Sequence, residues 1–85
     1  MASIDTTVLD TVGEVLNEPV GNLRTRPVLA AYEWDSVASL EVLAQLESRL
    51  RVTLDLRTYH GARTLQDLVD LVAAAVAAKA TADQR

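Results

Sequence analysis

Three stretches of this chain repeat their apolar residues at the spacing of an α-helix, and this pattern restricts the possible folds more than any other feature. The first contains Val8, Leu9, Val12, Val15 and Leu16, the second Val42, Leu43, Leu46 and Leu50, and the third Leu65, Leu68, Val69, Val72 and Val76. Residues three and four positions apart share one face of a helix, so each stretch predicts a helix with one apolar face. Such faces bury each other, which predicts an all-α bundle with three main helices.

The segments between these stretches add a long first loop and one short helix. Asn17, Pro19 and Gly21 interrupt the first helical pattern. Residues 18–34 contain both prolines and are expected to form a long connection, whose own apolar side chains pack it across the bundle. Residues 56–60 are expected to form one short helical turn. The prediction is therefore a four-helix bundle of three main helices and one short helix.

The last helix has a recognisable start and an indistinct end. Thr64 is followed three residues later by Asp67, which is a variant of the capping box that opens helices. Alanine dominates residues 73–80, where we expect the helix to fray. The 85 residues are expected to form a single domain that is ordered over about residues 5–78, with residues 80–85 as a disordered tail.

The composition excludes several classes of protein. A domain of 85 residues leaves no room for a deep active-site cleft. Cysteine is absent and His60 is the only histidine, so no disulfide and no metal site are expected. The net charge of −4 argues against a nucleic-acid partner. A signal peptide and an apolar stretch long enough to span a bilayer are both missing. We therefore expect a cytoplasmic monomer that binds neither nucleic acid nor membrane.

Ser36 lies at the predicted start of the second helix, directly after Asp35. Serine is common there as a helix cap, so the position by itself indicates only a cap. A catalytic nucleophile is unsupported, because the chain has no Gly-x-Ser-x-Gly motif and only His60 as a possible base. An exposed serine without an activating base is suited to modification by another enzyme, and a helix start would favour a phosphodiester. We therefore expect that the chain is not itself an enzyme.

Val37, Leu40 and Ala44 form an apolar shoulder beside Ser36, on the flank of the apolar stripe of the second helix. Two interpretations of this shoulder are open. It is either a docking surface near an exposed helix end or one side of a wide face that belongs to the core.

The sequence around Ser36 resembles the signature of the acyl and peptidyl carrier proteins. The matching residues are Asp35-Ser36-Val37, Leu40-Glu41-Val42, Leu46-Glu47 and Leu50, followed by Thr64-Leu65-Gln66-Asp67-Leu68-Val69 at the start of the last helix. The Asp-Ser pair alone is a weak signal. The pair together with the helix pattern and the downstream threonine is a specific one, and the resemblance covers about residues 5–76.

The resemblance implies a carrier with a four-helix fold. A phosphopantetheinyl transferase would take 4′-phosphopantetheine from coenzyme A and attach it to the hydroxyl of Ser36, and Asp35 would assist the docking of that transferase. The thiol of the arm would hold acyl intermediates as thioesters, which a loading enzyme supplies and downstream synthase or tailoring enzymes receive. The residues implied to face these partners are Val37, Leu40, Glu41, Ala44 and Glu47.

The chain departs from the family pattern in three places, one of which is Val37, where the usual residue is leucine. Most members have Leu-Gly where this chain has Tyr32-Glu33, and the missing glycine implies a different path into Ser36. Arg49 and Arg51 dilute the acidic surface that fatty-acid carriers have at the end of the second helix. These departures favour a dedicated pathway of secondary metabolism, such as polyketide, nonribosomal peptide or antibiotic biosynthesis.

Two alternatives to an acyl carrier stay open. One is an aminoacyl or peptidyl carrier, although the Gly-Gly-His/Asp-Ser motif common in peptidyl carriers is absent, which favours an acyl cargo. The other is a helical interaction module that keeps the fold without the arm. A discrete carrier and a domain excised from a larger synthase would have similar sequences.

Overall fold

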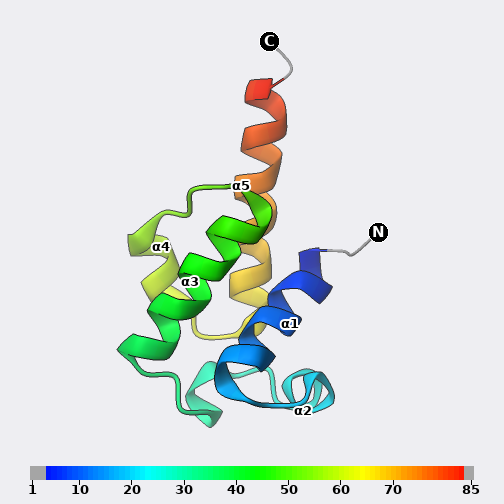
Figure 1. Ribbon diagram of the computed structural model, residues 1–85, viewed down its shortest axis with the longest axis vertical. Helices are drawn as coiled ribbons and strands as arrows, with labels where there is room; N and C mark the ends of the chain where they lie inside the picture. The colour runs from blue at the N-terminus through cyan, green and yellow to red at the C-terminus, as the bar shows by residue number, and fades with distance from the viewer. Residues whose placement is uncertain (1–3, 84–85) are drawn as a thin grey trace.

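The computed structural model describes residues 4–83, and these form five α-helices and one 3-10 turn (Figure 1). In chain order the elements are α1 (Ile4–Leu16), α2 (Val20–Thr25), the 3-10 turn η1 (Leu29–Ala31), α3 (Ser36–Leu50), α4 (Leu56–Gly61) and α5 (Leu65–Asp83). The predicted all-α class is confirmed. The three main helices lie where the apolar spacing places them, and the short α4 lies at the helical turn expected over residues 56–60.

The core forms where α1, α3 and α5 pack their apolar faces together. Its buried residues on these three helices are Val8, Leu9, Val12, Val42, Leu43, Leu46, Leu65, Leu68 and Val72. All of them belong to the three stripes that the sequence shows. The remaining stripe residues Val15, Leu16, Leu50, Val69 and Val76 are half-buried at the rim of the core. Burial of these faces is the main source of stability, because each fully buried aliphatic side chain contributes about 1.5–3 kcal/mol.

The connection between α1 and α3 contains a helix that the sequence analysis did not predict. Gly21 does not interrupt a helix but lies inside α2, whose N-cap is Pro19 in an extended conformation. Pro19 is compatible with this arrangement because proline fits the start of a helix. The sequence did not reveal α2 because a six-residue helix is too short to show an apolar period. The expected packing across the bundle is confirmed, since Leu23 of α2 and Leu29 of η1 are buried in the core.

A short backbone bridge pins the same connection to the far side of the molecule. The N–H of Leu29 donates to the carbonyl of Arg63 over 3.0 Å, and the N–H of Leu65 donates to the carbonyl of Pro27 over 2.8 Å. These bonds form an isolated antiparallel bridge between Val28 and Thr64. The first connection and the start of α5 therefore hold each other in place.

Side-chain caps fix the starts of α4 and α5. The carboxylate of Asp55 accepts hydrogen bonds from the hydroxyl and the N–H of Thr58, which hold the pKa of Asp55 below its ordinary value. At α5 the predicted capping box is confirmed. Thr64 Oγ1 accepts from the N–H of Asp67 over 3.1 Å, and Asp67 Oδ2 accepts from the N–H of Thr64 over 3.2 Å.

Helix α5 extends further than the sequence analysis predicts. It continues through the alanine-rich residues 73–80 to Asp83 and projects beyond the other helices (Figure 1). Alanine has the highest helix propensity of all residues, which favours a continuous helix through this stretch. Residues 84 and 85 of the expected tail lie outside the described residues. No helix among residues 4–83 is long and apolar enough to cross a membrane.

Gly13 allows the chain to turn sharply at the end of α1. Asn17 adopts a left-handed conformation with φ of 56°, and the N–H of Glu18 donates back to the carbonyl of Gly13 over 2.9 Å. A Cβ atom at position 13 would lie 2.8 Å from the carbonyl oxygen of Glu18. A side chain at this position is therefore incompatible with the turn into α2.

We expect Gly13→Ala to destabilise the protein by about 1–3 kcal/mol, because the added methyl group meets backbone that must shift. Gly21→Ala is the matched control, since a Cβ there meets nothing within 4 Å. Alanine normally stabilises a helix interior by about 0.5–1 kcal/mol relative to glycine, so Gly21→Ala should raise the free energy of unfolding. Urea denaturation measures both changes. A stability gain in both variants would show that the α1 turn does not need glycine.

Candidate functional site

Ser36 is the first residue of α3, and Asp35 caps the helix in front of it. The carboxylate of Asp35 accepts a hydrogen bond from the N–H of Ala38 over 2.8 Å. The cap function that the position of Ser36 suggests therefore belongs to Asp35. Ser36 is exposed, and its hydroxyl has no hydrogen-bond partner among the described residues. The structure thus leaves this hydroxyl free for chemistry outside the fold.

No base within the described part of the chain activates Ser36. His60 lies on the exposed side of α4, and its ring makes an edge-on contact with the ring of Tyr59 at a centroid distance of 5.7 Å. No group of three histidine, cysteine or carboxylate side chains within residues 4–83 is arranged to hold a metal ion. Ser36 therefore has the surroundings of a substrate side chain rather than those of a catalytic nucleophile.

The start of α3 is also electrostatically suited to an anionic group on Ser36. The first N–H groups of a helix lack partners within the helix and carry partial positive charge. Asp35 satisfies the N–H of Ala38, while Ser36 itself is exposed at the very end of the 15-residue helix. A phosphodiester attached to the hydroxyl of Ser36 would lie close to these N–H groups, which offset its repulsion by the neighbouring carboxylate of Asp35. The residues present thus fit a phosphate-linked group at this position.

The chain reaches Ser36 through a tight turn centred on Glu33. The N–H of Trp34 donates to the carbonyl of Tyr32 over 2.8 Å, which closes a three-residue turn. Glu33 does not have a positive φ angle. The path into Ser36 therefore does not need the glycine that most carriers have at this position.

An aromatic cluster beneath the site ties α4 to α3. The hydroxyl of the buried Tyr59 donates to the carbonyl of Ser39 over 2.6 Å. The ring of Trp34, which is half-buried, lies 6.5 Å from the ring of Tyr59 between centroids. The cluster supports both the loop before Ser36 and the first turn of α3. Sequence reasoning did not identify Tyr59, and its only signal was an aromatic residue in an otherwise polar short helix.

The structure decides between the two interpretations of the apolar shoulder on α3. Val37 is 74% exposed, Leu40 is 51% exposed, and Ala44 is also exposed, so the shoulder does not belong to the core. Glu41 is exposed on the same side of the helix. These residues form a continuous surface that begins at Ser36. We call Val37, Leu40, Glu41 and Ala44 the α3 face.

Two further residues near the α3 face differ from what the sequence predicts: Glu47 has a contact within the fold, and Leu56 is exposed. The carboxylate of Glu47 accepts a hydrogen bond from the N–H of Leu54 over 2.9 Å, so it holds the α3–α4 connection in place. The sequence analysis placed Glu47 among the residues that face partners. Leu56 of α4 is 51% exposed, and the sequence analysis did not single it out.

The two arginines at the end of α3 have roles within the fold. The guanidinium of Arg49 donates to Thr11 Oγ1 over 3.0 Å and pairs with the carboxylate of Glu14, which links α3 to α1. Arg51 ends α3 in a left-handed conformation with φ of 54°. The positive charge of Arg49 is thus directed to α1 and away from the α3 face.

Comparison with known proteins identifies a family. A family model described as "Phosphopantetheine attachment site" matches residues 6–72. This range includes Ser36, the α3 face and the aromatic cluster. No curated protein matches the chain.

Tyr59 gives the fold a measurable dependence on alkaline pH. Burial raises the pKa of its hydroxyl from 10.0 to about 12. The folded state therefore keeps the proton where the unfolded chain loses it, so this contribution is complete below pH 10 and is lost as the pH rises through 12. We expect the free energy of unfolding to fall by about 2 kcal/mol over this range from Tyr59 alone.

Tyr59→Phe is the control for this titration. The variant loses the hydrogen bond to Ser39, at a cost of about 1 kcal/mol near neutral pH. Because it also lacks the ionisable group, its stability should fall less between pH 10 and 12 than that of the wild type. Guanidinium denaturation at a series of pH values measures the difference. Parallel curves for the two proteins would contradict the assignment.

Proposed function

The chain belongs to the phosphopantetheine attachment site family, whose model matches residues 6–72 of 85, and from this membership we propose that it is a discrete acyl carrier modified at Ser36. Domains of this family carry 4′-phosphopantetheine as a covalent group. The thiol of that group holds the cargo as a thioester. The observation that supports Ser36 as the attachment point is its exposed hydroxyl without a partner at the capped start of α3.

The residues around Ser36 have distinct parts in this function. Asp35 fixes the first turn of α3 through Ala38, so that the hydroxyl of Ser36 projects from a rigid helix end. The hydroxyl gives up its proton, and its oxygen bonds to the phosphorus next to the pantetheine arm of coenzyme A, so that the pyrophosphate P–O bond breaks and adenosine 3′,5′-bisphosphate leaves. Because no base within residues 4–83 is bonded to the hydroxyl, we expect the phosphopantetheinyl transferase to supply the base. The carrier therefore contributes position and leaves catalysis to its partners.

The α3 face is the proposed contact surface for the transferase, the loading enzyme and the downstream synthase or tailoring enzymes. Two of its side chains, Val37 and Leu40, are large apolar groups exposed to solvent, which is a feature of protein interaction surfaces. Glu41 adds a free carboxylate beside them. Glu47 lies on the same side of α3 but contributes through the α3–α4 connection.

We assign the carrier to a dedicated cytoplasmic pathway of secondary metabolism, of polyketide or nonribosomal peptide type. Glu41 is the one exposed carboxylate within α3, so this helix lacks the strongly acidic surface of fatty-acid carriers. An acyl cargo is favoured over an aminoacyl or peptidyl cargo by the absence of the Gly-Gly-His/Asp-Ser motif. The enzymes encoded beside this gene are the observation that would identify the cargo.

Incubation of the protein with coenzyme A, magnesium and a broad-specificity phosphopantetheinyl transferase tests the central proposal. We expect the intact mass to increase by one phosphopantetheine in the wild type and to stay unchanged in Ser36→Ala. Because Ser36 is exposed, the substitution should change the stability by no more than about 0.5 kcal/mol. An unmodified wild type would support the arm-free interaction module, and modification of Ser36→Ala would place the site elsewhere.

Polar substitutions on the α3 face test its role in docking. We expect the double variant Val37→Ser/Leu40→Ser to raise the KM of the transferase for the carrier by roughly tenfold, because two apolar contacts at an interface are lost. Val28→Ser is the matched control, since Val28 is 47% exposed but lies in the first connection. An equal rise in KM for the control, or no rise for the double variant, would remove the α3 face from the interface.

A further inference from the structure

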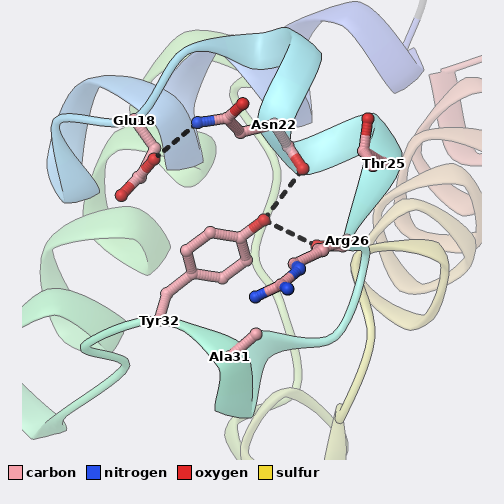
Figure 2. A pocket seen from close by; sticks show the side chains of 6 residues that line it. All are labelled: Glu18, Asn22, Thr25, Arg26, Ala31 and Tyr32. Atoms are coloured by element: carbon pink, nitrogen blue, oxygen red, sulfur yellow. Dashed lines mark hydrogen bonds between the residues drawn. The ribbon is translucent and has the colours of Figure 1, made fainter.

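The hydroxyl of Tyr32 joins the loop before Ser36 to the end of α2. It lies 2.7 Å from the carbonyl oxygen of Arg26 and 3.0 Å from that of Asn22, and it donates its proton to this pair of acceptors (Figure 2). The ring of Tyr32 forms one wall of an open hollow of about 360 Å³ that α2 and η1 also border. The hydroxyl thus reaches across this hollow to the backbone on its other side.

These are the hydrogen bonds that connect this part of the loop to a more distant segment. Within residues 30–34 of the described chain, the other hydrogen bonds are local. The N–H groups of Ala31, Tyr32 and Trp34 donate to carbonyls two or three residues earlier. Local turns of this kind do not fix where the loop lies relative to the bundle. The Tyr32 hydroxyl supplies a hydrogen-bonded connection to the end of α2, in addition to the packing of Trp34 on Tyr59.

The backbone that accepts these bonds is itself well anchored. Leu23 of α2 is fully buried, and Asn22 is further linked by its side-chain amide to the carboxylate of Glu18 over 3.2 Å. Downstream of Ser36, the hydroxyl of Tyr59 holds the carbonyl of Ser39 over 2.6 Å. In the sequence, Ser36 therefore lies between two tyrosines whose hydroxyls bind backbone carbonyls, and the upstream one joins the loop to the end of α2.

We propose that Tyr32 is a positioning residue, whose hydroxyl fixes the loop from Ala31 to Asp35 so that the transferase meets Ser36 in one geometry. This inference rests on the proposed function at Ser36. Tyr32 does not touch the reacting hydroxyl and acts through the turn at Glu33 and the cap at Asp35. It also gives a role to the tyrosine that stands where most carriers have leucine.

Steady-state kinetics of the transferase with Tyr32→Phe as substrate test this proposal. The variant keeps the ring and removes only the hydroxyl. If the loop leaves its bound position more often, the fraction of molecules competent to dock falls and the apparent KM for the carrier rises, while kcat stays unchanged. From the usual strength of such a bond we expect the KM to rise roughly two- to tenfold. Amide exchange at Trp34 should accelerate in parallel.

Thr25→Val is the matched control, because it removes a hydroxyl from the same hollow that bonds only within α2, to the carbonyl of Gly21 over 3.0 Å. We expect its KM and its Trp34 exchange to match the wild type. A purely structural role for Tyr32 would lower the melting temperature and leave the KM unchanged, and this result would overturn the proposal. If the wild type is not modified at all, the proposed function fails instead, so the two failures are distinguishable.

Discussion

The burial of one face of α3 is the constraint on which the rest of the structure depends. Val42, Leu43 and Leu46 are buried in the core, where α3 packs against α1, and this burial fixes the rotation of α3 about its own axis. Successive residues of a helix lie about 100° apart around its axis. The rotation that buries one face therefore also determines which residues of α3 face solvent. Val37 and Leu40 are exposed for that reason, and Ser36 stands at the free end of the same surface. The core and the candidate site are thus two sides of one helix.

The fold could be predicted from the sequence wherever a pattern is long or chemically specific. The three apolar stripes place the main helices, and Thr64 with Asp67 marks the start of α5. Helix α2 could not be predicted, because six residues show no period and Pro19 and Gly21 look like interruptions. At the site, Ser36 was identified through its motif. That Asp35 and not Ser36 caps α3 could be learned only from the structure, because serine and aspartate both cap helices.

Other parts of the site depend on contacts between residues far apart in the chain. The hydrogen bond from Tyr59 to Ser39 spans 20 positions, and that from Arg49 to Thr11 spans 38. No local pattern carries this information. Arg49 also shows that a count of charged residues in the sequence does not reveal which charges lie on the surface that partners contact. In the sequence Arg49 looks like a change in the surface that partners meet, whereas in the structure its guanidinium is occupied by Thr11 and Glu14 of α1.

The backbone bridge between Val28 and Thr64 has a consequence for the order in which the chain becomes structured. It closes a loop of more than 30 residues, and such contacts form later than the turns of individual helices. On the ribosome, Ser36 emerges well before Leu65, whose N–H completes the bridge to Pro27. A nascent chain therefore presents Ser36 before this bridge can form. It acquires the geometry of the mature site only when the start of α5 has been synthesised.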